Sequence, residues 1–124
     1  MRTALGAALV LALAVPAVAA AYASFRAPGR NVYCGLSDPK LPATLICWRA
    51  SDGLSLGMNG KGTALPSPDR NNRGFHQDRA PVLRLGQSWH RGPYRCASRR
   101  SDVRCTNASG HGWQLSLRRG YKVF

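Results

Sequence analysis

Four cysteines constrain this chain more than any other feature of its sequence. They are Cys34, Cys47, Cys96 and Cys105. An even number of cysteines, together with an export signal, predicts two disulfides formed in an oxidising compartment. Counting alone allows three pairings, and sequence locality favours Cys34–Cys47 and Cys96–Cys105. A zinc site is the rival interpretation, but no pair has the C-x₂₋₄-C spacing typical of structural zinc sites.

The export signal is residues 1–23. A short basic start, Met1–Thr3, precedes the stretch Ala4–Ala23, which is apolar apart from Gly6, Pro16 and Tyr22. Two A-x-A patterns near its end predict cleavage before Ala20 or Ser24, as in a secretory signal peptide. An uncleaved membrane anchor is the alternative, because about 20 apolar residues can span a bilayer. We therefore expect one domain, residues 24–124, in a secreted or periplasmic protein.

The composition of this domain argues against long helices. The chain has 13 Gly and 8 Pro and no Glu, and good helix formers are scarce in the predicted domain. Short apolar or alternating runs, bounded by Gly, Pro and Asn-Gly or Asp-Gly turns, instead predict strands. We expect a small all-β fold with long loops, either an antiparallel sandwich or a partly open barrel, stapled by the disulfides. The expected strands are residues 31–34, 45–48, 54–58, 81–85, 94–98, 103–107, 113–118 and 121–124, the last of them ending inside the fold.

Two segments between these strands are expected to lack regular structure. Residues 61–80 have no hydrophobic period and predict a long polar loop. Residues 89–93, which include Gly92 and Pro93, predict a turn. The cysteines at 96 and 105 then clamp a hairpin whose tip is Arg99–Asp102.

The charge is strongly positive. Eighteen Lys and Arg stand against five acidic residues, a formal charge of +13, and all five acids are Asp. Such a balance predicts attraction to polyanions. Alternation along the hairpin places Arg95 and Arg104 on one face. Nearby Trp89, Tyr94 and Trp113 suggest stacking on bases or sugars, whereas the alternative is a solvated face without a ligand. The basic clusters are Arg70/Arg73/Arg79, Arg91/Arg95/Arg99/Arg100/Arg104 and Arg118/Arg119/Lys122.

Several motifs occur in a fixed order along the domain. They are F-x-x-P-x-x-N-x-x-C (Phe25 to Cys34), L-x-L-G-Q-x-W (Leu83 to Trp89), C-x-S (Cys96 to Ser98) and V-x-C-T-N-x-x-G-H-G-W-x-L-S (Val103 to Ser116). This order resembles a family of small secreted bacterial domains of unknown function. Some relatives carry a further cysteine pair in the middle region, which this chain lacks. The resemblance implies an exported fold and brings no activity or ligand.

The turn Gly110-His111-Gly112-Trp113 is the most site-like piece of the sequence. Glycines on both sides of His111 permit close backbone approach, and Asn107 and Ser109 are candidate hydrogen-bond neighbours. The alternative is that His111 only locks a tight turn between strands.

A secreted ribonuclease-like hydrolase would pair His111 with His76 or His90 and a cation. No G-x-S-x-G elbow supports a serine hydrolase, and the histidine spacing predicts no metal site. We therefore predict a non-enzymatic domain without a cofactor that binds an anionic polymer or a membrane or wall surface. Its candidate binding residues are Arg95, Arg104, Asn107, His111 and Trp113. The alternatives are the hydrolase and a structural envelope protein with no ligand.

Overall fold

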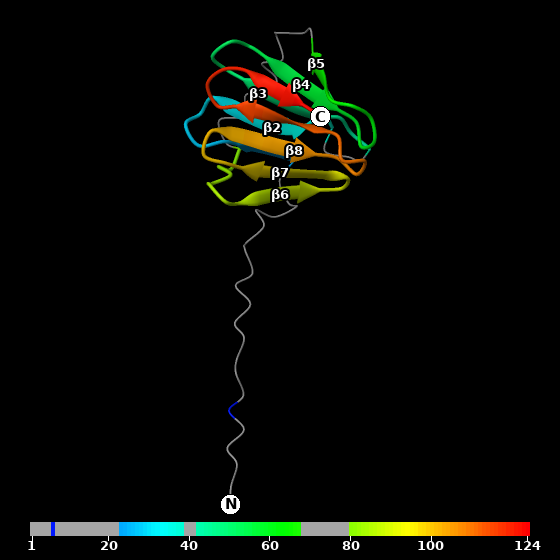
Figure 1. Ribbon diagram of the computed structural model, residues 1–124, viewed down its shortest axis with the longest axis horizontal. Helices are drawn as coiled ribbons and strands as arrows, with labels where there is room; N and C mark the ends of the chain where they lie inside the picture. The colour runs from blue at the N-terminus through cyan, green and yellow to red at the C-terminus, as the bar shows by residue number, and fades with distance from the viewer. Residues whose placement is uncertain (1–5, 7–22, 39–41, 68–79) are drawn as a thin grey trace, which may run out of the picture.

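The computed structural model describes residues 23–38, 42–67 and 80–124, together with Gly6. These residues form two five-stranded antiparallel sheets and no helix, so the predicted all-β class is confirmed. The two open sheets pack face to face as a sandwich (Figure 1). No helix that could cross a membrane occurs in this described part of the chain. The expected signal peptide lies outside the described residues, except for Gly6 and Ala23.

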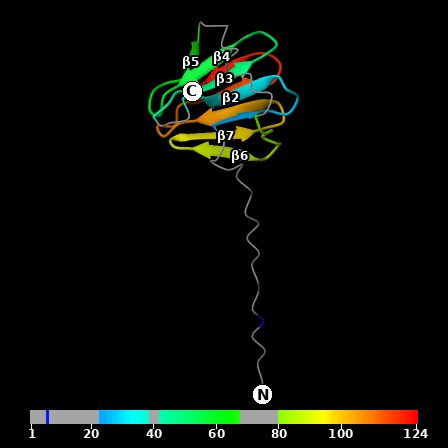
Figure 2. The ribbon, with the colours of Figure 1, turned by 180° about the vertical axis from the view of Figure 1, so that it is seen from behind.

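Each sheet is a meander, in which strands consecutive in the chain are neighbours in space. The first sheet has the order β1 (Ser24–Arg26), β2 (Val32–Leu36), β3 (Leu45–Arg49), β4 (Ser55–Met58) and β5 (Leu65–Ser67). The second has the order β10 (Tyr121–Val123), β9 (Gly112–Ser116), β8 (Asp102–Thr106), β7 (Tyr94–Ser98) and β6 (Ser88–Arg91). Figures 1 and 2 show the first sheet in cyan to green and the second in yellow to red.

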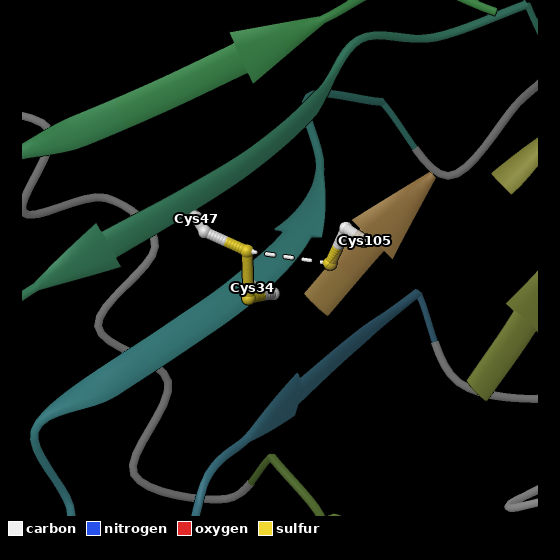
Figure 3. Close-up of side chains that lie close together, drawn as sticks. All are labelled: Cys34, Cys47 and Cys105. Carbon is white, nitrogen blue, oxygen red and sulfur yellow. Dashed lines mark hydrogen bonds between the residues drawn. A yellow bond between two sulfur atoms is a disulfide. The ribbon is translucent and has the colours of Figure 1, made fainter. Parts of the chain in front are cut away.

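The disulfides lie at the centre of the core, one in each sheet. Cys34 on β2 bonds to Cys47 on β3, and Cys96 on β7 bonds to Cys105 on β8, so both predicted pairings are confirmed. Sγ of Cys47 lies 3.9 Å from Sγ of Cys105 on the facing sheet (Figure 3). The chain-entropy estimate assigns each bond about 3 kcal/mol of stability.

The residues beside the disulfides follow the same order in both sheets. An aromatic residue faces the first cysteine of each pair and a large apolar residue faces the second. The two rows are Phe25, Cys34, Cys47 and Leu56, and Trp89, Cys96, Cys105 and Trp113. The rings of Phe25 and Trp89 meet across the sandwich with centroids 5.3 Å apart. The core is therefore two stacked rows of similar composition, with sulfur at the middle.

Polar side chains close the sandwich at both ends. Nδ2 of Asn107, in the β8–β9 turn, donates to the carbonyl oxygens of Asn59 (3.0 Å) and Gly62 (2.7 Å) in the β4–β5 loop. At the other end, Nδ2 of Asn31 donates to the carbonyl oxygen of Leu117 at 2.7 Å. Each bond joins a turn of one sheet to a turn or loop of the other, so the relative position of the sheets is fixed by more than apolar packing.

Three strands were not predicted. β1 and β5 are each three residues long, too short for alternation to identify. β6 replaces the turn expected at residues 89–93, because Trp89 faces inward opposite Cys96 and the chain reverses only at Gly92 and Pro93. β5 begins inside the expected loop 61–80, of which residues 68–79 lie outside the described part.

Two expectations about strands are wrong. Residues 81–85 form no strand. They dock against β1 through one bridge, from Val82 to Arg26, and bonds from Arg26 N to Pro81 O (3.0 Å) and from Leu83 N to Arg26 O (2.8 Å). Proline has no N–H for a ladder, which limits pairing at this point. The last strand also does not end inside the fold, because β10 is an edge strand and every residue of it is exposed.

Candidate anion-binding surface

Arginines gather at one end of the sandwich, which we call the cationic end. It consists of the β1–β2, β3–β4, β7–β8 and β9–β10 turns and the segment before β6. Hydrogen bonds link these turns: Ala50 N donates to Asn31 O at 2.7 Å, and Leu117 N donates to Ser101 O at 3.0 Å. The exposed arginines at this end are Arg30, Arg84, Arg99, Arg100, Arg118 and Arg119.

The acidic residues at the cationic end are already paired. Asp102 lies 3.1 Å from Nε of Arg99, and Asp52 lies 2.6 Å from Nη2 of Arg49. The hydrogen bond from the Arg49 guanidinium holds the pKa of Asp52 below its usual value. The other exposed arginines of this end have no ion-pair partner in the described part of the chain, so their charge is available to an external anion.

Arg49 positions the β9–β10 turn from inside the protein. Its side chain is only 2% exposed although it carries a charge. Nη1 donates to the carbonyl oxygens of Ser116 (2.9 Å) and Gly120 (2.8 Å), while Nε and Nη2 donate to the Asp52 carboxylate. A buried charge is tolerated only when it is paired and hydrogen-bonded. This arginine therefore ties the end of β3 to the turn that carries Arg118 and Arg119.

A hollow lies between the β7–β8 and β9–β10 turns. Its volume is about 380 Å³, and we call it the arginine hollow; it is lined by Arg100, Ser101, Ser116, Leu117 and Arg118. Oγ of Ser116 accepts hydrogen bonds from the backbone N–H groups of Arg118 and Arg119, each at 3.2 Å, and so shapes the turn. Two guanidinium groups and two hydroxyl groups line one concavity, a donor set suited to a carboxylate, sulfate or phosphate group.

A second hollow adjoins the first at the second sheet. Its volume is about 250 Å³, and we call it the tyrosine hollow; its lining includes Asp102, Gln114, Arg119, Tyr121 and Lys122. Ser101 and Ser116 line both hollows. The two hollows are therefore neighbours, one beside the turns and the other beside the sheet.

The outer face of the second sheet extends this positive surface. Arg95 and Arg104 both point outward, as predicted, since their neighbours Cys96 and Cys105 face the core. Lys122 pairs with Gln114, which pairs in turn with Arg104. The Arg104 guanidinium lies 4.8 Å from the ring centroid of Phe124, a cation–π contact.

The aromatic residues expected to stack on a ligand are not accessible. Trp89, Tyr94 and Trp113 are all 0% exposed and belong to the core. Trp113 therefore cannot touch a ligand bound at the surface, because it faces inward beside Cys105. The accessible aromatic rings of the second sheet are instead those of Tyr121 and Phe124, 45% and 37% exposed.

Asn107 and His111 lie at the opposite end from the arginine hollow. Oδ1 of Asn107 accepts the backbone N–H groups of Ser109 and His111, each at 3.1 Å, and Asn107 is 7% exposed. Asn107 therefore shapes the turn rather than facing solvent. The half-buried His111 ring makes no hydrogen bond with any residue that the structure describes.

The histidines of the described chain are not paired. His90 on β6 lies level with Arg95 on β7, Thr106 on β8 and Gly112 on β9. Three strand spacings therefore separate His90 from Gly112, the neighbour of His111. That distance is about 14 Å, too long for joint acid–base work on one group. His76, the other histidine considered for a hydrolase, lies outside the described residues, as do Arg70, Arg73 and Arg79.

The opposite end of the sandwich also contains a hollow, of different character. Its volume is about 480 Å³, and its lining includes Pro42, Ala43, Pro93 and Tyr94, without a charged residue. The Tyr94 hydroxyl donates to the carbonyl oxygens of Ala43 and Met58, and burial raises its pKa. This hollow therefore differs from the arginine hollow in the charge of its lining.

One cluster of metal-ligand atoms occurs among the described residues. It consists of the sulfurs of Cys34, Cys47 and Cys105 (Figure 3). All three are bound in disulfides, whereas the thiolate is the form that ligates metals. The two disulfides indicate an oxidising environment outside the cytoplasm.

No protein family, curated protein or solved structure matches this chain. The resemblance to small secreted domains stays an expectation based on the motifs.

Sequence reasoning identified the arginine clusters but missed the other residues that line the two hollows. Gln114 and Tyr121 belong to no motif, and Ser116 ends the motif that begins at Val103 but was not considered as a site residue. Their position along the chain was the available signal, because Arg99–Arg100 directly follows the predicted strand 94–98 and Arg118–Arg119 lies at the end of the predicted strand 113–118. Two arginine pairs at strand ends predict charged turns, whereas the contact between those turns depends on the bond from Leu117 to Ser101.

Proposed function

We propose that this protein binds an anionic polymer or surface without catalysis, through arginines at the cationic end and on the outer face of the second sheet. It acts outside the cytoplasm, as a secreted or periplasmic domain released from a signal peptide at residues 1–23. The observation that carries the proposal is the arginine hollow, where Arg100 and Arg118 line one concavity with no acidic residue in its lining.

Physical chemistry favours arginine for this role. A guanidinium presents five donors in a fixed plane and binds carboxylate, sulfate and phosphate groups bidentately. Four further cations, Arg95, Arg104, Arg119 and Lys122, extend from the hollow over the second sheet. A polymer with repeated anionic groups contacts several of them at once and releases its counterions, so its affinity falls steeply as salt rises.

The test compares single charge removals at the two ends of the molecule. Arg100→Gln and Arg118→Gln each remove a charge from the arginine hollow, and Lys61→Gln removes an exposed one at the opposite end. Affinity for heparin is measured as a function of salt. Each hollow variant should weaken binding about tenfold, the equivalent of one charge-assisted hydrogen bond, and should flatten the salt dependence. Lys61→Gln should change affinity less than twofold.

Two results would overturn the proposal. Wild-type protein that elutes from heparin resin at low salt has no polyanion site, which leaves a structural role without a ligand. Equal losses in all three variants would mean that net charge, and not the hollow, determines binding.

A further inference from the structure

The strand β10 forms one edge of the second sheet and has no strand on its outer side in the described part of the chain. The backbone N–H groups of Gly112 and Phe124 each donate to the carbonyl oxygen of the other residue, at 3.0 and 3.1 Å. In an antiparallel ladder, such hydrogen-bonded pairs alternate with pairs that exchange no bonds. Lys122 therefore bonds to β9, whereas the N–H and C=O groups of Tyr121 and Val123 point away from β9, toward the open edge.

The two faces of β10 differ in chemistry. Tyr121 and Val123 face the interior of the sandwich, because their partners on β9 belong to the core. Their side chains are nevertheless 45% and 41% exposed, which reflects their place on an edge strand. Lys122 points to the outer face, where Arg104 lies in the same row. A strand added at this edge would therefore meet apolar side chains on its inner face and positive charge on its outer face.

We infer that β10 binds an extended peptide segment of a partner protein in which acidic and apolar residues alternate. The segment adds to the sheet as a further antiparallel strand. Its backbone exchanges hydrogen bonds with Tyr121 and Val123, the mode of peptide recognition known as β-strand addition. Its apolar side chains cover those of Tyr121 and Val123, and an acidic side chain lies opposite Lys122. The contact at Lys122 is close, because non-hydrogen-bonded pairs bring their side chains nearest to each other.

A second copy of this chain fits the edge less well. Full antiparallel pairing of β10 with its own copy places the two Lys122 side chains opposite each other, and like charges in that position destabilise a sheet. The chain also has a formal charge of +13, so two copies repel each other. Lysine on an edge strand is a device against such self-pairing, and the same charge attracts an acidic strand.

The first experiment measures binding of the oxidised protein to a short labelled peptide in which glutamate and valine alternate. In the docked strand the amides of the valines face β10 and those of the glutamates face solvent, because backbone and side-chain directions alternate together. N-methylation of the valines should therefore lower affinity about tenfold, the equivalent of one or two hydrogen bonds. N-methylation of the glutamates is the matched control and should change affinity less than twofold.

Charge reversal tests the pairing with Lys122. Lys122→Glu should lower affinity for the glutamate peptide about fivefold, the effect of turning an attractive cross-strand pair into a repulsive one. It should raise affinity for the corresponding lysine–valine peptide. Arg100→Glu makes the same change of net charge at the β7–β8 turn and should change both affinities less than twofold, since salt screens exposed charges that lie far apart.

Hydrogen exchange supplies a structural readout of the same contact. In the free protein the amides of Tyr121 and Val123 should exchange faster than the amide of Lys122, which bonds to β9. Addition of the glutamate peptide should slow the exchange of Tyr121 and Val123 selectively.

Three results would overturn the inference. Equal effects of the two N-methylated peptides would mean that the peptide binds through its charge alone, which leaves the proposed function standing. Slow, concentration-dependent exchange of the Tyr121 and Val123 amides without peptide would mean that a second copy occupies the edge. No detectable binding of the glutamate peptide would leave Lys122 as a device that only prevents self-pairing.

Discussion

Replacing Arg49 with methionine tests how the interior supports the cationic end. Methionine has a similar length but no charge and no donor. The change removes four hydrogen bonds: two to Asp52 at 2.6 and 3.0 Å, one to Ser116 O at 2.9 Å and one to Gly120 O at 2.8 Å. The last two bonds hold the β9–β10 turn against β3, so both stability and ligand binding should respond.

The expected loss of stability follows from these bonds. A hydrogen bond from a charged donor contributes about 1.5–3 kcal/mol, and two carbonyl oxygens lose such a donor. Asp52 is 47% exposed and regains water, so the broken ion pair adds little. We expect the free energy of unfolding to fall by about 3 kcal/mol. For a domain of about 100 residues, that change lowers the thermal midpoint by about 15 °C.

The measurement is thermal and urea unfolding followed by circular dichroism, with the disulfides intact. Asp52→Asn is the matched control, because it weakens the ion pair and leaves the donors of Arg49 to Ser116 O and Gly120 O in place. It leaves the buried Arg49 charge without a counter-ion, so it also lowers stability, but it should leave heparin binding unchanged because the turn keeps both of its bonds to Arg49. Arg49→Met should also weaken heparin binding, since the turn that carries Arg118 loses its support. An equal loss of heparin affinity in both variants, or no loss of stability in Arg49→Met, would refute the assignment of the two carbonyl bonds.

Three further predictions concern pH, backbone space and a turn. The pKa of Asp52 is lowered in the folded state, so the stability that the ionised carboxylate contributes is present above pH 3.8 and is lost as pH falls through the lowered pKa. The urea stability of the wild type should therefore approach that of Asp52→Asn at acid pH. A Cβ on Gly112 would overlap the carbonyl group of Cys105, whereas one on Gly57 finds ordinary contacts at 3.7 Å. Gly112→Ala should therefore lower the urea midpoint far more than Gly57→Ala. Asn107→Ala removes two donors to the β4–β5 loop and should cost about 2–3 kcal/mol in the same assay.

The general fold could be predicted because its signals are local. The cysteines lie close in sequence within each pair, so locality gave the correct pairing. Alternation identified the central strands, where one side of each strand faces the core. The three missed strands lie at or next to the edges of the sheets or are very short, and Trp89 was assigned to a turn because Gly92 and Pro93 follow it so closely.

The candidate site could be predicted only in part, because it depends on contacts between distant segments. Runs of arginine predict positively charged turns. Nothing in the sequence indicates that Ser101 lies beside Leu117 or that a hollow lies between their turns. The aromatic residues illustrate the same limit. Trp113 and Tyr121 are both aromatic residues in the last strands, yet one faces the disulfides and the other lies on an uncovered edge. The fully buried position of Arg49 is likewise visible only with its partners.

The meander order of the two sheets has a consequence for how the protein matures. Ribosomes deliver a polypeptide from its N-terminus, and Cys34 and Cys47 precede the other two cysteines along it. Each native bridge joins two strands that are consecutive in the chain, across 13 residues in one sheet and 9 in the other. Either sheet can therefore close its own bridge without a thiol from the other sheet.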